Sequence, residues 1–338
     1  MEKVLVLTHA DETGAALTKA SLEAISAGSD LAVRLSASLS IGIVAAEPEP
    51  LSKGLPGAVL AVSGAAFAQP AYASDASACE ALCRAANATI VLAPSSARFA
   101  RVMAGASHRL GGVIDTHITA LGGSAAPEAT RWYYRQRVEA VVTRTARPWF
   151  LLLEAGVAPA FATNSEAAQL QVVPVQLPAA RTTVTGIRAP KQDEQTIRPD
   201  AKLLFVAGAG WTKKQPDGQV HASEASDLIL GFLRTTGASL GSSKSLVDQG
   251  SEGQPVLPFL THLNQIGQTG ATPRHAKGLA TCCHGEEPHV VGWRFIGSRR
   301  AVSLDPNCGW TRGKADVVYI ADAFRVIEKL NGLLAAKG

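Results

Sequence analysis

Short runs of apolar residues alternate with helical patterns along the first half of the chain, and this alternation is the strongest constraint on its fold. The apolar runs occupy 4–7, 40–45, 58–62 and 89–93. They are apolar throughout instead of at every second position, which is typical of strands covered on both faces. Helical patterns lie between them at 14–27 and 74–86. The chain is therefore predicted to begin with an α/β domain that contains a mostly parallel sheet.

The helix near 14–27 has recognisable ends in the sequence. Its apolar residues Leu17, Ala20 and Ala24 fall on one face. Thr13 is a suitable N-cap, and Gly28 stands where glycine commonly ends a helix. We expect the helix to begin after Thr13 and to stop at Gly28.

A change of composition divides the chain. The stretch 181–200 is polar, contains two prolines and lacks apolar periodicity. At roughly 150 residues per domain, a chain of this length is expected to form about two domains. We therefore predict an N-terminal α/β domain over 1–180, a linker over 181–200 and a second α/β domain over 201–338.

The second domain begins like the first. An apolar run at 203–206 leads into Gly208-Ala209-Gly210, and a helical pattern then places apolar residues at 225, 228, 229, 232 and 233. The glycine turn is similar to a dinucleotide-binding turn but lacks the third glycine, so a tight strand-to-helix turn is the alternative interpretation. A closing helix is expected at 321–334.

Composition excludes several classes of protein. Of the 338 residues, 46% are apolar and 18% are charged, with a net charge of +4. The chain is too apolar for a disordered protein and too weakly charged for a nucleic-acid clamp. It has no run close to the roughly 18 to 20 apolar residues of a membrane span, and the apolar run at 4–7 is shorter than a secretory signal is expected to have. We expect a cytoplasmic protein that has no membrane span and binds no nucleic acid.

The five cysteines are odd in number and unevenly spread, which favours reduced thiols. Cys282-Cys283-His284, with His289 and Cys308, offers the ligand types that zinc prefers. Adjacent cysteines rarely chelate one ion and no Cys-x-x-Cys pair is present, so no metal site is predicted. Cys79 and Cys83 are interpreted as one buried helix face. A nucleophilic Cys–His pair is a further alternative, although nothing marks an oxyanion donor for it.

Aromatic and basic residues gather at Trp132-Tyr133-Tyr134 with Arg131, Arg135 and Arg137. Such a cluster could stack on nucleic acid. We favour a subunit-contact strand in which the arginine stems lie along apolar surface.

Three motifs follow one another in the second domain. They are Gly241-Ser242-Ser243-Lys244-Ser245-Leu246-Val247-Asp248, Gln265-Ile266-Gly267-Gln268-Thr269-Gly270 and Gly285-Glu286-Glu287-Pro288-His289. In order and spacing they resemble motifs in the α subunit of the electron-transfer flavoproteins. Ala315-Asp316 and Ala321-Asp322-Ala323-Phe324 follow in that family's order. The Gly-Gln-Thr-Gly segment is identical to the one that borders the flavin ring in the family.

The first domain agrees with this resemblance in outline. It contains Val91-Leu92-Ala93-Pro94-Ser95-Ser96, followed by Arg98 and Arg101, and then Asp115-Thr116-His117-Ile118-Thr119-Ala120. The resemblance therefore covers nearly the whole chain. It implies an N-terminal α/β domain that packs on a β subunit and a C-terminal flavodoxin-like domain that binds FAD.

The resemblance also implies a function. Proteins of this family are heterodimers that carry electrons and do not convert a substrate of their own, and AMP is expected in the partner β subunit. This chain would accept electrons from a flavoprotein dehydrogenase and pass them to a quinone-linked or iron–sulfur acceptor, as part of an oxidoreductase complex. The protein would tune the cofactor's potential, and the cofactor would supply the redox chemistry.

Roles for individual residues follow from the resemblance. Thr269 would donate its hydroxyl to flavin N5, with Gln268 and Gly270 shaping that edge of the ring. His289 would face the N1/O2 side, where negative charge accumulates on reduction. The full set of implied FAD-binding residues is Ser243, Lys244, Gln268, Thr269, Gly270, His284, Gly285, His289, Ser303, Asp305 and Asp322.

The chain departs from the family at several of these positions. Lys244 stands where the family has arginine, and its ammonium cannot stack on a ring as a guanidinium can. Ala209 replaces a second arginine, and Cys282 and His284 replace small residues of the phosphate loop. Pro288 replaces a glutamine. These changes suggest a second hypothesis, a flavin-deficient paralogue that acts as a scaffold in a larger dehydrogenase complex. A third is an unrelated nucleotide-binding enzyme that uses Cys283 or His284.

Overall fold

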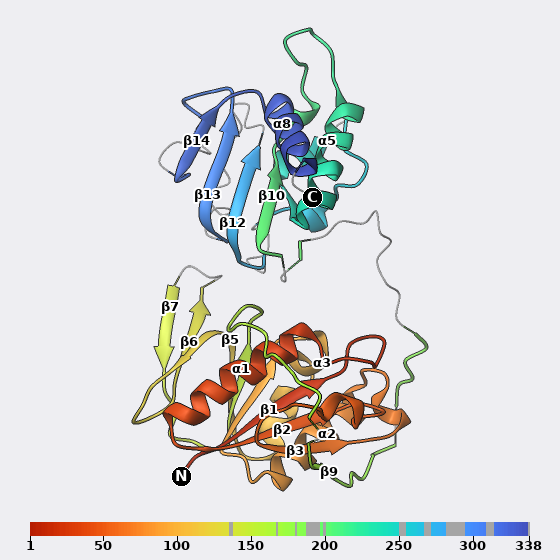
Figure 1. Ribbon diagram of the computed structural model, residues 1–338, viewed down its shortest axis with the longest axis vertical. Helices are drawn as coiled ribbons and strands as arrows, with labels where there is room; N and C mark the ends of the chain where they lie inside the picture. Colours follow the sequence, from red (N-terminus) through yellow and green to blue (C-terminus); the bar gives the residue numbers. More distant parts are fainter. Residues whose placement is uncertain are drawn as a thin grey trace. The chain divides into compact units, whose positions relative to one another are not determined.

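The computed structural model divides the chain into two compact units, Met1–Arg188 and Ala189–Gly338 (Figure 1). It describes residues 1–134, 138–166, 168–179, 181–186, 197–198, 201–249, 255–266, 272–281, 295–308 and 314–336. The point of division lies within 181–200, the stretch that the sequence analysis treats as a linker. Each unit is an α/β domain with its own sheet, so the predicted fold class is confirmed.

Unit 1 is built on a nine-stranded sheet with the order β7-β6-β5-β8-β4-β1-β2-β3-β9. Its strands are β1 (Lys3–His9), β2 (Ser38–Val44), β3 (Ala58–Val62), β4 (Ile90–Pro94), β5 (Val113–Gly122), β6 (Glu128–Tyr133), β7 (Val138–Val142), β8 (Trp149–Leu153) and β9 (Leu170–Val172). The sheet is parallel except that β6 pairs antiparallel with both β5 and β7. The prediction of a mostly parallel sheet is confirmed, and the antiparallel ribbon at one edge is an addition to it.

Helices cover both faces of this sheet. They are α1 (Lys19–Arg34), α2 (Tyr72–Ala85), α3 (Ala97–Ala100) and α4 (Met103–Arg109), with short 3-10 turns η1 (Pro50–Ser52) and η2 (Ala65–Phe67). Alternate residues of β1 pack on opposite faces of the sheet. Val4 and Val6 pack in the cluster with α1, whereas Leu5 and Leu7 pack in the cluster with α2 and α4. This is why the strands read as continuously apolar in the sequence.

Helix α1 begins and ends later than the sequence predicts. The N-cap is Thr18, whose Oγ1 accepts a hydrogen bond of 3.1 Å from the amide of Ser21. Thr13 instead donates its hydroxyl to Asp11 Oδ1 in the preceding turn. Gly28 lies inside the helix, and a Cβ added there would come within 2.3 Å of Val6 Cγ2. The glycine therefore permits a close approach of α1 to β1 and does not end the helix.

Unit 2 contains a five-stranded sheet with the order β11-β10-β12-β13-β14, and all its strand pairs are parallel. The strands are β10 (Leu203–Ala207), β11 (Ser239–Ser242), β12 (His275–Thr281), β13 (Ile296–Ser303) and β14 (Val317–Ile320). Numbered along the chain, this is the order 2-1-3-4-5 of the flavodoxin-like fold. The direction of winding reverses between β10 and β12.

Two helices pack on one face of this second sheet, α5 (Ala222–Thr236) and α8 (Ala323–Ala335), and they lie next to each other (Figure 1). Shorter elements follow the strand ends: η3 (Ala209–Thr212), α6 (Lys244–Asp248) and η5 (His262–Asn264). The opposite face packs on Ile266, Phe295 and Cys308. Asp322 caps α8, and the helix begins two residues after the predicted start.

Within the described ranges, no helix is both long enough and apolar enough to cross a bilayer.

Candidate functional site

The carboxyl edge of the second sheet is the candidate site. In open α/β sheets, ligands bind outside the carboxyl ends of the strands, where the direction of winding reverses. Ser243 and Lys244 directly follow β11, Ser303 ends β13, and Asp305 follows it. Asp322 follows β14. The topology thus brings these predicted residues to one edge. Gln268, Thr269, Gly270, His284, Gly285 and His289 lie outside the described residues.

Lys244 is held by a neighbouring carboxylate. Its Nζ lies 3.1 Å from Asp248 Oδ2, one helical turn further along α6, and 53% of its side chain is exposed. Nδ1 of His262 lies 3.7 Å from the other oxygen of Asp248. Sequence reasoning missed Asp248 and His262 as members of this group. The spacing of four residues between Lys244 and Asp248 on a helix is the signal that could have revealed the pair.

The other described candidates make local hydrogen bonds. Ser243 Oγ caps α6 by accepting from the amide of Leu246 at 3.2 Å. Asp322 Oδ1 accepts from the amide of Phe324 at 2.9 Å and so caps α8. Helix capping alone therefore explains why a serine and an aspartate stand at these two helix starts, even with no ligand bound. These contacts leave the serine hydroxyl hydrogen and one carboxylate oxygen of Asp322 for other partners.

The turn after β13 is held by its own side chains. Ser303 Oγ donates to the carbonyl of Asp305 and accepts from its amide, both at 3.2 Å. Asp305 Oδ1 accepts from the amide of Asn307 at 2.8 Å. The turn fixes the direction of the chain at the carboxyl edge, and it keeps the carboxylate of Asp305 next to the strand end.

A tryptophan fills the point where the sheet reverses its direction of winding. Trp211 is fully buried in η3, directly after β10. Its Nε1 donates to Thr281 Oγ1 at 2.8 Å, and Thr281 Oγ1 donates to the carbonyl of Val206 at 3.0 Å. The indole also contacts the ring of Phe324, with centroids 4.6 Å apart. This group packs at the carboxyl ends of β10 and β12, and sequence reasoning did not single it out.

A buried acceptor stands beside this edge. Gln265 forms a parallel bridge with Ser242 at the end of β11, and the amide of Ile266 donates to the carbonyl of Ser242 at 3.1 Å. Gln265 Oε1 is buried, and within the described ranges it accepts no hydrogen bond. Buried polar atoms are nearly always paired in folded proteins. The edge therefore has a free acceptor for a donor that is not among the described groups.

The cysteines that the structure describes form no metal site. In the part of the chain that the structure describes, no group of three or more His, Cys, Asp or Glu side chains could hold a metal ion. Cys282, Cys283, His284 and His289 fall outside that part. Cys79 and Cys83 are buried on α2, as predicted, and burial raises the pKa of both thiols. These two thiols are protonated and unreactive at neutral pH.

In the aromatic cluster of unit 1, Arg131 is occupied by internal contacts. Its Nη1 lies 2.8 Å from Asp115 Oδ1, and its guanidinium lies over the ring of Tyr133 at 4.4 Å from the centroid. Tyr134 is exposed at the end of β6. Arg135 and Arg137 lie outside the described residues. These contacts make Arg131 a structural residue of the antiparallel ribbon.

Comparison with known proteins gives one family. Residues 6–180, just over half of the chain, match the model of the electron transfer flavoprotein domain. No curated protein matches. Among solved structures, a glycosyl transferase family 9 protein from Veillonella parvula DSM 2008 aligns over 100% of this chain and 98% of its own, at 9% identity and a TM-score of 0.23. A TM-score this low carries no argument about fold or function.

Proposed function

Because this chain belongs to the electron transfer flavoprotein family, we propose that it is the α subunit of such a flavoprotein and that unit 2 holds FAD. The observation that carries the proposal is the strand order β11-β10-β12-β13-β14. This order places the predicted residues of three strand ends along one carboxyl edge, which is where flavodoxin-like sheets bind their ligands. The family match itself covers unit 1, whereas the residues proposed to bind the cofactor lie in unit 2.

The hydrogen-bonding groups of the described residues suit the donors and acceptors of a flavin nucleotide. Gln265 Oε1 offers a buried acceptor, which suits the hydroxyl or imide donors of FAD. The free carboxylate oxygen of Asp322 suits a ribose hydroxyl, and Ser243 retains a hydroxyl hydrogen to donate. When bound, FAD supplies a centre that takes up and releases electrons.

The remaining roles concern residues outside the described ranges. We assign Thr269 to the N5 edge of the flavin, with Gln268 and Gly270 beside it, and His289 to the N1/O2 side. We assign His284 and Gly285 to the phosphates. A donor on the N1/O2 side stabilises the reduced ring more than the oxidised one, because reduction adds negative charge there.

The proposed partners follow from the family. The chain pairs with a β subunit that holds AMP, accepts electrons from a flavoprotein dehydrogenase and delivers them to a quinone-linked or iron–sulfur acceptor. The exposed apolar side chains of the β6–β7 ribbon, Tyr134, Val138 and Val141, suit a contact between subunits. Electron transfer requires only that two redox centres come close, so no acid–base residues are needed.

The test is the absorbance spectrum of the complex purified with its β subunit. We expect the bands of oxidised flavin at close to one FAD per α chain. AMP should be released in the same amount when the complex is denatured. A complex that contains AMP but no flavin would contradict the proposal for unit 2 while leaving the family assignment intact.

A scaffold function is the second candidate, and two observations favour it. Lys244 is paired with Asp248, which neutralises the cation expected beside the ring. Ala209 is buried at the glycine turn and supplies no guanidinium in place of the family's arginine. If the complex contains no flavin and still associates with a dehydrogenase, the scaffold is the correct function.

We predict that Lys244→Ala lowers the potential of the bound flavin by about 60 mV. The loss of one charge-assisted contact costs about 1.5 kcal/mol, which for a one-electron couple corresponds to this shift. The measurement is a spectroelectrochemical titration of the purified complex. Lys244→Arg keeps the charge and serves as the control. An unchanged potential in Lys244→Ala would show that the ammonium acts only on Asp248.

A further inference from the structure

The sheet of unit 1 also reverses its direction of winding. From β1 the chain passes to β2 and β3 on one side, and β4 then pairs with β1 on the other side. In open α/β sheets, the carboxyl ends of the strands at such a point border a ligand site. In unit 1 they carry His9, the last residue of β1, and Ser96, two residues after the end of β4. Neither residue belongs to the candidate site in unit 2.

The two side chains are hydrogen-bonded to each other across this reversal. His9 Nε2 lies 2.9 Å from Ser96 Oγ, and His9 Nδ1 lies 2.7 Å from the carbonyl oxygen of Ala10. A carbonyl oxygen can only accept, so the ring proton is on Nδ1, and Nε2 accepts the hydroxyl hydrogen of the serine. A serine, a histidine that accepts its proton and a group that orients the histidine are the parts of an activated nucleophile.

The environment of His9 keeps its ring neutral. The residue is 9% exposed, and its ring meets that of Phe99 edge-on with centroids 5.3 Å apart. Burial lowers the pKa of His9, and the positive charge of Arg98 lowers the pKa further, although the hydrogen bond to Ala10 acts in the opposite direction. The ring is therefore unprotonated at neutral pH, and Nε2 can take up the proton of Ser96.

The hydroxyl of Ser96 is partly exposed and is only weakly engaged as a helix cap. The residue lies in the turn between β4 and α3. Its Oγ accepts from the amide of Phe99 at 3.4 Å, which is long for a hydrogen bond. An asparagine caps a helix as well as a serine does, so capping does not explain the contact with His9. The oxygen retains a lone pair with which it can attack an electrophile.

The charges beside the pair favour an uncharged reactant. The guanidinium of Arg98 is the cation that acts on His9, and it is already paired with Asp75 at 2.7 Å. An anionic phosphoryl donor would need a cation to neutralise it. An uncharged ester has no such requirement.

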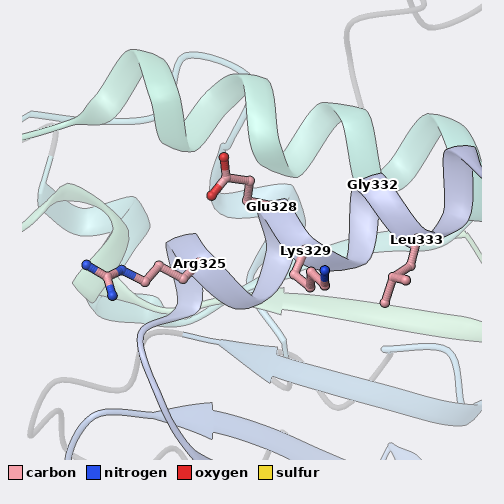
Figure 2. A pocket seen from close by; sticks show the side chains of 5 residues that line it. All are labelled: Arg325, Glu328, Lys329, Gly332 and Leu333. Carbon is pink, nitrogen blue, oxygen red and sulfur yellow. The ribbon is translucent and has the colours of Figure 1, made fainter.

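A hollow of about 560 Å³ in unit 2 has a different chemistry. Its lining residues lie along α8 and are Arg325, Glu328, Lys329, Gly332 and Leu333 (Figure 2). They include no histidine and no hydroxyl group, so this hollow offers no nucleophile beside a base.

We propose that Ser96 is a nucleophile activated by His9 and that it accepts an acyl group from an activated, uncharged ester. A bond forms between Ser96 Oγ and the acyl carbon, and the bond between that carbon and the leaving oxygen breaks. The proton of Ser96 passes to His9 Nε2 and then to the leaving oxygen, which departs as an alcohol. The inference concerns unit 1 and does not rest on the binding of FAD.

The first test is labelling of the full-length chain with a fluorophosphonate. Ser96 Oγ forms a bond to phosphorus and fluoride leaves, and peptide mapping by mass spectrometry should find one label per chain, on Ser96. Ser96→Asn keeps an oxygen that can cap α3 but has no hydroxyl, so it should take no label. Ser95→Asn is the matched control, since it makes the same change at the exposed neighbouring serine and should be labelled as the unmodified chain is.

A second variant tests the role of the histidine. His9→Gln has no base, so we expect its labelling to be about 100-fold slower, which is typical of the loss of a general base. Circular dichroism and thermal unfolding verify that the variants are folded.

Acyl transfer itself is measured with p-nitrophenyl acetate. The unmodified chain and Ser95→Asn should release a burst of one nitrophenolate per chain as the serine is acetylated. Ser96→Asn should show no burst.

Several outcomes would overturn the proposal. These are the absence of a label on Ser96, labelling of His9→Gln as fast as that of the unmodified chain, or a label on Ser96 without a burst of nitrophenolate. Flavin content, measured on the same samples, reports separately on the proposed function, because a chain without flavin should still be labelled on Ser96.

Discussion

Replacement of Arg98 by alanine is expected to destabilise unit 1 by about 3–5 kcal/mol, because it leaves a buried carboxylate without its counter-charge. Arg98 Nε and Nη2 donate to Asp75 Oδ1 at 3.0 and 2.7 Å, and Nη2 also donates to the carbonyl of Phe67 at 2.8 Å. The two side chains are 5% and 0% exposed. The pair joins α2 to the start of α3, next to the end of β4.

The free energy of unfolding, from urea denaturation, measures this effect. Arg84→Ala is the matched control, because Arg84 forms an ion pair of 2.8 Å with Glu80 on the surface of α2 and such pairs contribute at most about 1 kcal/mol. The double variant Asp75→Leu/Arg98→Met removes both charges and should recover most of the lost stability. Equal costs for Arg98→Ala and Arg84→Ala would refute the account of the buried pair.

Asp115→Ala is expected to cost a similar amount, about 3–5 kcal/mol. The carboxylate of Asp115 accepts from Arg131 Nη1 at 2.8 Å and from Arg144 Nε and Nη2, both at 2.9 Å. It also accepts from the buried indole of Trp149 at 2.9 Å. Its removal leaves two guanidinium groups and one indole without their acceptor, at the base of the β5–β6–β7 ribbon.

The effect of Asp115→Ala should depend on pH. Burial alone would raise the pKa of Asp115, but hydrogen bonds from Arg144 and Trp149 outweigh burial and hold the pKa below its usual value. A carboxyl group with a lowered pKa in the folded state contributes stability above its unfolded pKa of about 3.9 and loses it as the pH falls through the folded value.

Unfolding at neutral pH and near pH 3 tests this dependence. The difference in stability between the wild-type chain and Asp115→Ala should be largest at neutral pH and should shrink in acid. Asp115→Asn keeps an acceptor oxygen without the charge, so we expect an intermediate cost. A difference that is the same at both pH values would mean that Asp115 acts by packing and not as an anion.

Much of the fold could be predicted, because short runs of apolar residues in the sequence mark its strands. The apolar runs at 40–45, 58–62 and 89–93 correspond to β2, β3 and β4 within two residues at each end. The predicted ends of α1 were wrong, because the choice between Thr13 and Thr18 as N-cap depends on tertiary contacts. Gly28 is needed because a Cβ at this position would clash with the side chain of Val6. No local sequence pattern reveals that contact.

The candidate site was only partly predictable. Chain order and strand ends suffice to place Ser243, Ser303 and Asp322 along one edge, since the carboxyl ends of parallel strands meet there. The ion pair of Lys244 with Asp248 was missed although their spacing of four residues on α6 could have revealed it. The burial of Trp211 depends on contacts with Thr281 and Phe324, which are far away in sequence. Non-local contacts of this kind leave no periodic signal.

The late pairing of β9 has a consequence for the synthesis of the protein. Strand β9 follows β8 in the chain but pairs with β3 at the far edge of the sheet, with Leu170 beside Val59. While the ribosome has delivered only the residues up to β8, the outer backbone groups of β3 have no strand beside them, and such an edge can recruit strands of other nascent chains. The outer edge of β3 is therefore open to pairing with other chains until β9 has left the exit tunnel.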